Sequence, residues 1–227
     1  MCCRYHVEEY LYDEVDKIPG LQHGVVRHIT GDIHPTDTAP VIVKAFGEDT
    51  MSIEEPGEGN MSVEEPGSIL RNADLFSKKN GNSLILSDMA WGFKAFDEGN
   101  LLINARAESL LRKPAFRGLA KENRCVIPAT SFYEWDNTRD KVTFTHLEQP
   151  VMYFAGCYKI LPDGMHYVII TTAANDSMTP VHDRMPLILE KDMIPAWILN
   201  SGKTGDILKM ASPELSLYRP YEQLSFL

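Results

Sequence analysis

The chain has 227 residues and a net charge of −10, with 44% hydrophobic and 24% charged residues. This composition is ordinary for a soluble globular protein that buries a full core. No stretch approaches the ~20 apolar residues of a membrane helix, and the N-terminus turns acidic where a secretion signal needs an apolar run, so we expect a protein of the bacterial-type cytosol with no membrane partner.

The predicted elements are mostly short strands with a few helices between them. The first is a helix over Glu8–Val15, which begins with acidic residues and is followed by Pro19 and Gly20. Strands are predicted at Val41–Ala45, Ser83–Leu86, Val126–Pro128, Ser131–Trp135, Val142–His146, Val151–Ile160 and Tyr167–Thr172. Shorter helices are predicted at Pro114–Glu122, Asp192–Leu199 and Thr204–Met210. This order favours an α+β fold, a single β-rich domain over residues 1–227 with a partly closed antiparallel β-barrel core and short peripheral helices.

An acidic segment interrupts this pattern at residues 48–67. It carries seven acidic groups, no Lys or Arg, and a duplicated heptapeptide, MSIEEPG and MSVEEPG. Its Gly, Pro and Glu content is typical of an exposed insertion loop. Taking these seven charges from the net −10 leaves −3 for the rest of the chain, so the charge permits a local basic groove for nucleic acid.

The four cysteines lie at positions 2, 3, 125 and 157. This distribution has neither the pattern of a secreted disulfide framework nor the paired C-x-x-C spacing of a structural zinc site, so we predict no metal. Cys125 and Cys157 are expected to be buried, inert thiols.

Cys2 is the first candidate for chemistry. Removal of Met1 would give Cys2 a free α-amine, whose reference pKa of about 7.7–8.0 lies near that of a thiol, about 8.5. A 1,2-aminothiol forms a Schiff base with an aldehyde through its amine, and its thiol then closes a thiazolidine ring. Position alone favours the other interpretation, an early residue that only packs.

Three later segments place polar residues among apolar ones. In Ile103–Glu108, Asn104 is suited to orient an amine or an oxyanion, and Arg106 to pair with a phosphate. Glu134 lies between aromatic residues on a predicted buried strand, where burial raises a carboxyl pKa and suits acid/base catalysis. After Pro180, His182 is suited to shuttle a proton and Arg184 to hold a phosphate. Taken singly, each of these residues also fits a purely structural or surface role.

Together and in order, these segments resemble the SOS response-associated peptidase (SRAP) family. The motifs are M-C-C-R, N-A-R-x-E, R-C-x-I-P-A-x-x-F-Y-E-W and H-x-R-M-P, which run from residue 1 to roughly residue 190. The resemblance implies one β-rich domain around a positively charged cleft. It also implies covalent capture of abasic sites in single-stranded DNA through the N-terminal cysteine, in a protein that associates with the nucleoid when bound to DNA.

The resemblance also implies roles for individual residues. Cys2 would be the nucleophile, Asn104 would position its amine, Glu134 would act as acid/base, and His182 would aid proton transfer and sugar-ring opening. The residues implied to bind DNA are Arg4, Pro35, Trp91, Arg106, Thr172 and Arg184. For Trp91, stacking on a base competes with packing in the core. We expect a monomer and no cofactor.

The sequence departs from the family's pattern at Cys3, where Gly is usual, and at Asp32-Ile33-His34-Pro35, where Asn-x-Ala-Pro is usual. Asp32 thus brings a carboxylate close to the expected DNA surface. Two other functions remain open. One is an N-terminal-nucleophile peptidase that removes its own Met1, and the other is a module that binds single strands without a covalent bond.

Overall fold

The structure is a computed structural model, which describes residues 3–24, 26–45, 83–94 and 100–219. Cys2 and the acidic segment at residues 48–67 lie outside the described residues. No helix among the described residues is long and apolar enough to cross a membrane.

The core is a closed five-stranded barrel. Its strands, in the order in which they pair, are β5 (Leu84–Trp91), β4 (Thr38–Lys44), β9 (Arg124–Ala129), β12 (Met152–Leu161) and β13 (Gly164–Ala173). The first four pairings are antiparallel, and β13 returns to β5 through a parallel pairing of His166 with Ala90 and Tyr167 with Trp91. A ring with an odd number of strands cannot alternate direction at every pair, so one pairing has to be parallel. The predicted α+β class with a β-barrel core is confirmed, and the barrel is closed by this parallel pair.

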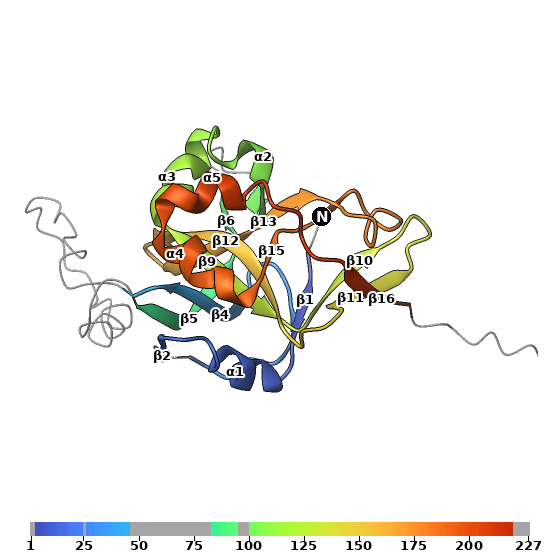
Figure 1. Cartoon of the computed structure of the whole chain (residues 1–227), viewed down its shortest axis with the longest axis horizontal. Coiled ribbons are helices and arrows are strands. Elements are labelled where there is room, and N and C mark those ends of the chain that lie inside the picture. The colour runs from blue at the N-terminus through green and yellow to red at the C-terminus, as the bar shows by residue number, and fades with distance from the viewer. Residues whose placement is uncertain (1–2, 25, 46–82, 95–99, 220–227) are drawn as a thin grey trace, which may run out of the picture.

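A second sheet of five strands lies beside the barrel, on the right of Figure 1. In pairing order it contains β16 (Leu215–Tyr218), β11 (Lys141–His146), β10 (Ser131–Trp135), β1 (Tyr5–Val7) and β3 (Gly31–Ile33). β10 follows the barrel strand β9 with only Thr130 between them. Both the backbone N–H and the hydroxyl of Thr130 donate to the His6 carbonyl, each at 2.9 Å. The chain therefore passes from the barrel into the second sheet at a point that β1 holds in place.

The remaining elements are short and peripheral. The strands are β2 (Leu21–His23), β6 (Phe93–Lys94), β7 (Leu101–Leu102), β8 (Asn104–Arg106), β14 (Arg184–Pro186) and β15 (Ile188–Leu189). The helices are α1 (Tyr10–Val15), α2 (Ala107–Leu110), α3 (Pro114–Glu122), α4 (Ile194–Leu199) and α5 (Thr204–Ile207), with 3₁₀ turns at Lys191–Met193 and Ser201–Lys203. In Figure 1, α2 to α5 gather on one side of the barrel and α1 lies on the other.

Two predicted elements, β10 and α3, begin and end at the residues that the sequence predicted. The helix predicted over Asp192–Leu199 is instead a 3₁₀ turn followed by α4, which has Pro195 in its first turn. Proline has no N–H to donate and is favoured at the start of a helix, so the α-helix begins here and not at Asp192. The sequence does not predict β3, β8 and β14, because three residues are too few to show a periodicity.

The side chain of Arg124 joins the barrel to two helices. Arg124 is 4% exposed, and its guanidinium donates to the carbonyls of Ala120, Lys121, Trp197 and Ile198. These carbonyls belong to the last turns of α3 and α4, where the helix dipole favours a positive charge. Arg124 thus fixes both helix ends against β9.

Cys125 and Cys157 are both fully buried, as predicted. Burial raises the pKa of the Cys157 thiol to about 12 and raises the pKa of Cys125 well above its usual value. Both thiols are therefore protonated at neutral pH and unsuited to act as nucleophiles.

Candidate active site

Glu134 lies on β10, directly beside the N-terminal strand. β1 pairs with β10 through Tyr5 and Phe132, and the Tyr133 N–H donates to the Arg4 carbonyl at 3.1 Å. Continued toward the N-terminus, this register places Cys3 opposite Glu134. After burial, the charge of Glu134 is the largest influence that raises the pKa of the Cys3 thiol, which agrees with this placement.

The Glu134 carboxyl is buried, as the aromatic residues around it in the sequence predicted. Its residue is 4% exposed. Burial raises the pKa of Glu134, and the neighbouring positive charge of His182 opposes the rise without cancelling it. A carboxyl with a raised pKa keeps its proton nearer to neutrality and is suited to donate it. The fold thus brings Glu134, His182 and Cys3 into electrostatic contact from three separate segments.

The ring of His182 is oriented by the backbone that follows it. The Arg184 N–H donates to His182 Nδ1 at 2.9 Å. An acceptor at Nδ1 fits the neutral ring that carries its proton on Nε2. The carboxylate of Asp183 lies 3.0 Å from the same Nδ1 and would pair with it when the ring is protonated. Both protonation states of His182 therefore have a partner at Nδ1.

Arg184 is held by a bidentate ion pair. Its guanidinium donates to the two carboxylate oxygens of Glu108 at 2.6 and 3.0 Å and to the Thr171 carbonyl at 2.6 Å. The Arg184 side chain is only 13% exposed, and its hydrogen bond lowers the pKa of the Glu108 carboxyl. A DNA phosphate would therefore have to share Arg184 with Glu108. The sequence motif contained Glu108 but did not reveal this role, because its partner lies 76 residues further along the chain.

β8 brings two more predicted residues to the same corner. It pairs in parallel with β13, with Asn104 opposite Ile169 and Arg106 opposite Thr171. Asn104 and Arg106 are two residues apart on the strand and share a face, with the buried Ala105 between them on the other. Arg106 is exposed and Asn104 half-buried. The half-buried Thr172 lies next along β13, opposite Met185 of β14. Strands β8, β13 and β14 thus gather Asn104, Arg106, Thr172 and Arg184.

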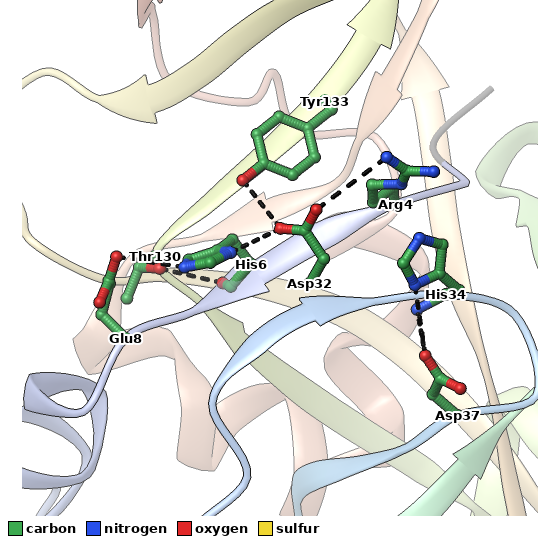
Figure 2. Close-up of polar contacts among 8 residues, drawn as sticks. All are labelled: Arg4, His6, Glu8, Asp32, His34, Asp37, Thr130 and Tyr133. Carbon is green, nitrogen blue, oxygen red and sulfur yellow. Dashed lines mark hydrogen bonds and ion pairs between the residues drawn. The ribbon is translucent and has the colours of Figure 1, made fainter.

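Arg4 follows Cys3 and lies on the opposite face of the β1–β10 pair, beside a polar cluster that Figure 2 shows. Its guanidinium carbon is 5.3 Å from the centre of the Trp135 ring, and its Nη1 is 4.0 Å from Asp32 Oδ2. Asp32 also accepts a hydrogen bond from the Tyr133 hydroxyl at 3.1 Å and lies 2.6 Å from His6 Nδ1. The predicted residue Pro35 is half-buried in the turn that follows β3. The sequence did not indicate this cluster, because its members come from three strands.

Trp91 requires a correction. Its side chain is 0% exposed, and its ring stacks on Tyr167 at 6.2 Å and packs against Tyr5 at 5.3 Å. Its indole N–H donates to the Ile103 carbonyl at 2.9 Å. A ring enclosed by the barrel cannot stack on a DNA base, so Trp91 has the core-packing role that the sequence left open.

No group of three or more His, Cys, Asp or Glu side chains that could hold a metal ion occurs within the described part of the chain. A cavity of about 370 Å³ lies between α3 and the β6–β7 pair, where Phe93, Leu102 and Leu119 line it. None of the predicted site residues that the structure describes lines this cavity.

Comparisons with known proteins agree on one family. The family model "SOS response associated peptidase (SRAP)" matches residues 1–223. The abasic site processing protein YoaM of Bacillus subtilis is 36% identical in an alignment 157 residues long that covers 63% of this chain and 66% of YoaM. The abasic site processing protein HMCES of Gallus gallus is 28% identical in an alignment 180 residues long that covers 63% of this chain and 52% of HMCES. The aligned parts thus span about two thirds and about half of these relatives.

Two solved structures from Bordetella bronchiseptica have the same fold. One matches with a TM-score of 0.68 and 17% identity over 97% of this chain and 100% of its own. The other, a phage-related protein, matches with a TM-score of 0.69 and 18% identity over 97% of this chain and 95% of its own. At this identity the likeness concerns the fold alone.

Proposed function

The chain belongs to the SOS response-associated peptidase (SRAP) family, and from this we propose that it processes abasic sites in single-stranded DNA through a covalent bond from Cys2. Relatives of this family are named abasic site processing proteins. The single observation that carries the proposal is the buried Glu134 carboxyl beside the N-terminal strand, opposite Cys3 in the β1–β10 register. Cys2 directly precedes Cys3 in the sequence.

The proposed reaction uses both nucleophiles of Cys2. With Met1 removed, the α-amine adds to the aldehyde carbon of the ring-opened abasic sugar, and loss of water gives an imine. The thiol sulfur then bonds to the imine carbon, and the thiol proton passes to the nitrogen. The product is a five-membered thiazolidine that joins protein and DNA. An abasic site already lacks its base, so no base has to be flipped out of a stack.

The surrounding residues supply the protons and hold the reactants. Glu134, whose pKa burial raises, protonates the hydroxyl that leaves as water. His182, with a partner at Nδ1 in both protonation states, moves the proton that opens the sugar ring. Asn104 orients the Cys2 amine from β8. The DNA backbone is held by residues on both sides of this centre, namely Arg4, Pro35, Arg106, Thr172 and Arg184.

The test is a cross-linking assay. Full-length protein with Met1 removed is incubated with an abasic single-stranded oligonucleotide, and adducts are counted on a denaturing gel. We expect a stable adduct with the wild type and none with Cys2→Ala. Cys3→Ser is the matched control, since it removes the neighbouring thiol and keeps the aminothiol. Equal adduct from Cys2→Ala would refute the proposal, and salt-sensitive binding without any adduct would point to a non-covalent single-strand module.

A second activity, self-removal of Met1, is favoured by the same placement of Glu134. A buried carboxyl opposite Cys3 would serve proton transfer at the Met1–Cys2 peptide bond. The intact mass of Glu134→Ala separates the two origins of processing. Retained Met1 indicates a peptidase that acts on itself, and normal removal indicates an aminopeptidase of the host.

A further inference from the structure

Arg4 lies between an aromatic ring and a carboxylate. On one side its guanidinium carbon is 5.3 Å from the Trp135 ring centre, and on the other its Nη1 is 4.0 Å from Asp32 Oδ2. About a third of each side chain, 32% for Arg4 and 33% for Asp32, is exposed. Arg4 directly follows Cys3, and Trp135 directly follows Glu134, so this pair is next to the candidate active site along both strands but lies on the opposite face of the β1–β10 pair.

Asp32 is fixed in place by two other side chains. The β1–β3 register sets Asp32 opposite His6, whose Nδ1 lies 2.6 Å from Oδ1. The Tyr133 hydroxyl donates to the same oxygen at 3.1 Å, which leaves Oδ2 directed at Arg4, as Figure 2 shows. Partial burial opposes ionisation, but the hydrogen bonds from His6 and Tyr133 hold the pKa of Asp32 below its usual value. The Asp32 carboxyl is therefore ionised at neutral pH, and its two hydrogen bonds hold it in one position.

A DNA strand bound on this face would offer Arg4 a second anionic acceptor. A backbone phosphate and the Asp32 carboxylate both carry negative charge and both bind a guanidinium through oxygen. A phosphate that binds Arg4 therefore either displaces the Asp32 carboxylate or lies beside it, where the two negative charges repel each other and weaken binding. Charges at the rim of a binding surface act mainly on the association rate and on the salt dependence of binding.

We propose that Asp32 limits the affinity for single-stranded DNA by competing with a backbone phosphate for Arg4. This inference rests on the proposed function, because it requires DNA to approach Arg4. Asp32 touches neither the reacting atoms nor the nucleophile and acts through Arg4, so it is a positioning residue. The substitution Asp32→Asn isolates the charge, since an amide oxygen still accepts from Tyr133 and His6 while the negative charge is removed.

The experiment measures binding without chemistry. Full-length protein with Met1 removed is titrated into a fluorescent single-stranded oligonucleotide that has no abasic site, at several salt concentrations. We expect Asp32→Asn to bind about fivefold more tightly at low salt, the size of an exposed ion pair. The slope of log K against log salt should steepen by about 0.7, the value for one more phosphate neutralised on a single strand.

Asp37→Asn is the matched control. Asp37 is exposed in the turn after the same strand, but its carboxylate lies 3.4 Å from His34 Nδ1, not beside an arginine. This substitution removes the same charge five residues further on, and we expect less than a twofold effect. An equal gain from both substitutions would overturn the inference, because general repulsion would then explain it.

A double-substitution cycle tests the route through Arg4. We expect the gain from Asp32→Asn to disappear in an Arg4→Gln background, since no guanidinium remains to be released. A full gain in that background overturns the inference. So does an unchanged affinity of Asp32→Asn while the wild type binds DNA and forms adducts, and in that case the proposed function stands. If the wild type neither binds nor cross-links, both fail together.

A measurement on the unsubstituted protein covers the case in which Asp32→Asn loses its fold. In NMR titrations with the same oligonucleotide, the Arg4 Nε and Asp32 Cγ resonances should move together as the phosphate replaces the carboxylate. A shift at Arg4 with none at Asp32 overturns the inference.

Discussion

At the scale of single residues, Glu134 combines a structural cost with its proposed chemical use. It is the only charged residue of β10, and it lies 4% exposed beneath the N-terminal strand. Burial raises its pKa, so the folded protein holds this proton more tightly than the unfolded chain does. The stability that this proton provides is present below the usual carboxyl pKa and is lost as the pH rises. At a pH high enough to ionise the buried carboxyl, Glu134 therefore lowers the stability of the protein.

Glu134→Gln separates these two effects. The amide cannot ionise, so the variant should melt at a higher temperature than the wild type at pH 8 and at the same temperature at pH 4. The same variant should cross-link abasic DNA about a hundredfold or more slowly, because it has no proton to give. Thermal melting and adduct formation measure the two effects. Glu148→Gln, which changes an exposed Glu, should alter neither. A Glu134→Gln variant that cross-links at the wild-type rate would remove Glu134 from the mechanism.

At the scale of elements, the corner of β8, β13 and β14 joins three separate sequence segments. The Glu108–Arg184 pair connects the start of α2 with β14, and the Arg184 guanidinium also binds the Thr171 carbonyl of β13. The backbone N–H of Arg184 in turn donates a hydrogen bond to His182. The Glu108–Arg184 ion pair is therefore linked through Arg184 to the candidate proton shuttle. This corner is assembled by tertiary contacts alone.

Glu108→Gln should slow adduct formation by up to about fivefold, the size expected for one partly exposed ion pair. Glu108 is half exposed, so the change should leave the melting temperature close to that of the wild type. Rates from denaturing gels at saturating oligonucleotide measure the chemical step, and anisotropy measures DNA binding. An unchanged rate together with tighter binding would contradict the positioning role and indicate that Glu108 only occupies Arg184.

At the scale of the whole molecule, the closed barrel and its helices depend on one buried charge. Four backbone carbonyls at two helix ends accept the protons of the Arg124 guanidinium. Removing the guanidinium would leave these carbonyls buried without a donor, which is among the few changes that cost several kcal/mol.

Arg124→Met should lower the free energy of unfolding by about 3–5 kcal/mol. Urea denaturation followed by circular dichroism measures the change. Arg117→Met is the matched control, because Arg117 is exposed on helix α3, whose last turn Arg124 binds, and should change stability by less than about 0.5 kcal/mol. A similar loss from both variants would show that the loss does not depend on the four carbonyls that Arg124 binds.

The sequence by itself determined what depends on neighbouring residues. Local pattern and residue type predicted the bounds of β10 and α3 and revealed the family motifs. They also predicted the burial of Glu134, Cys125 and Cys157. Local pattern works here because periodicity and capping act over a few residues. The parallel closure of β13 on β5 also follows once five strands are in the ring, but the ring itself is not visible in the sequence.

Only the tertiary structure decided which partner each functional candidate has. Trp91 is in the core and not on the proposed DNA surface, Arg184 is paired with Glu108, and Arg4 is paired with Asp32. Arg184 and its partner are 76 residues apart, and Arg4 and Asp32 meet only because β1 and β3 pair. Such contacts depend on strand register and barrel closure, which are collective properties of the fold, so no local pattern could have indicated them.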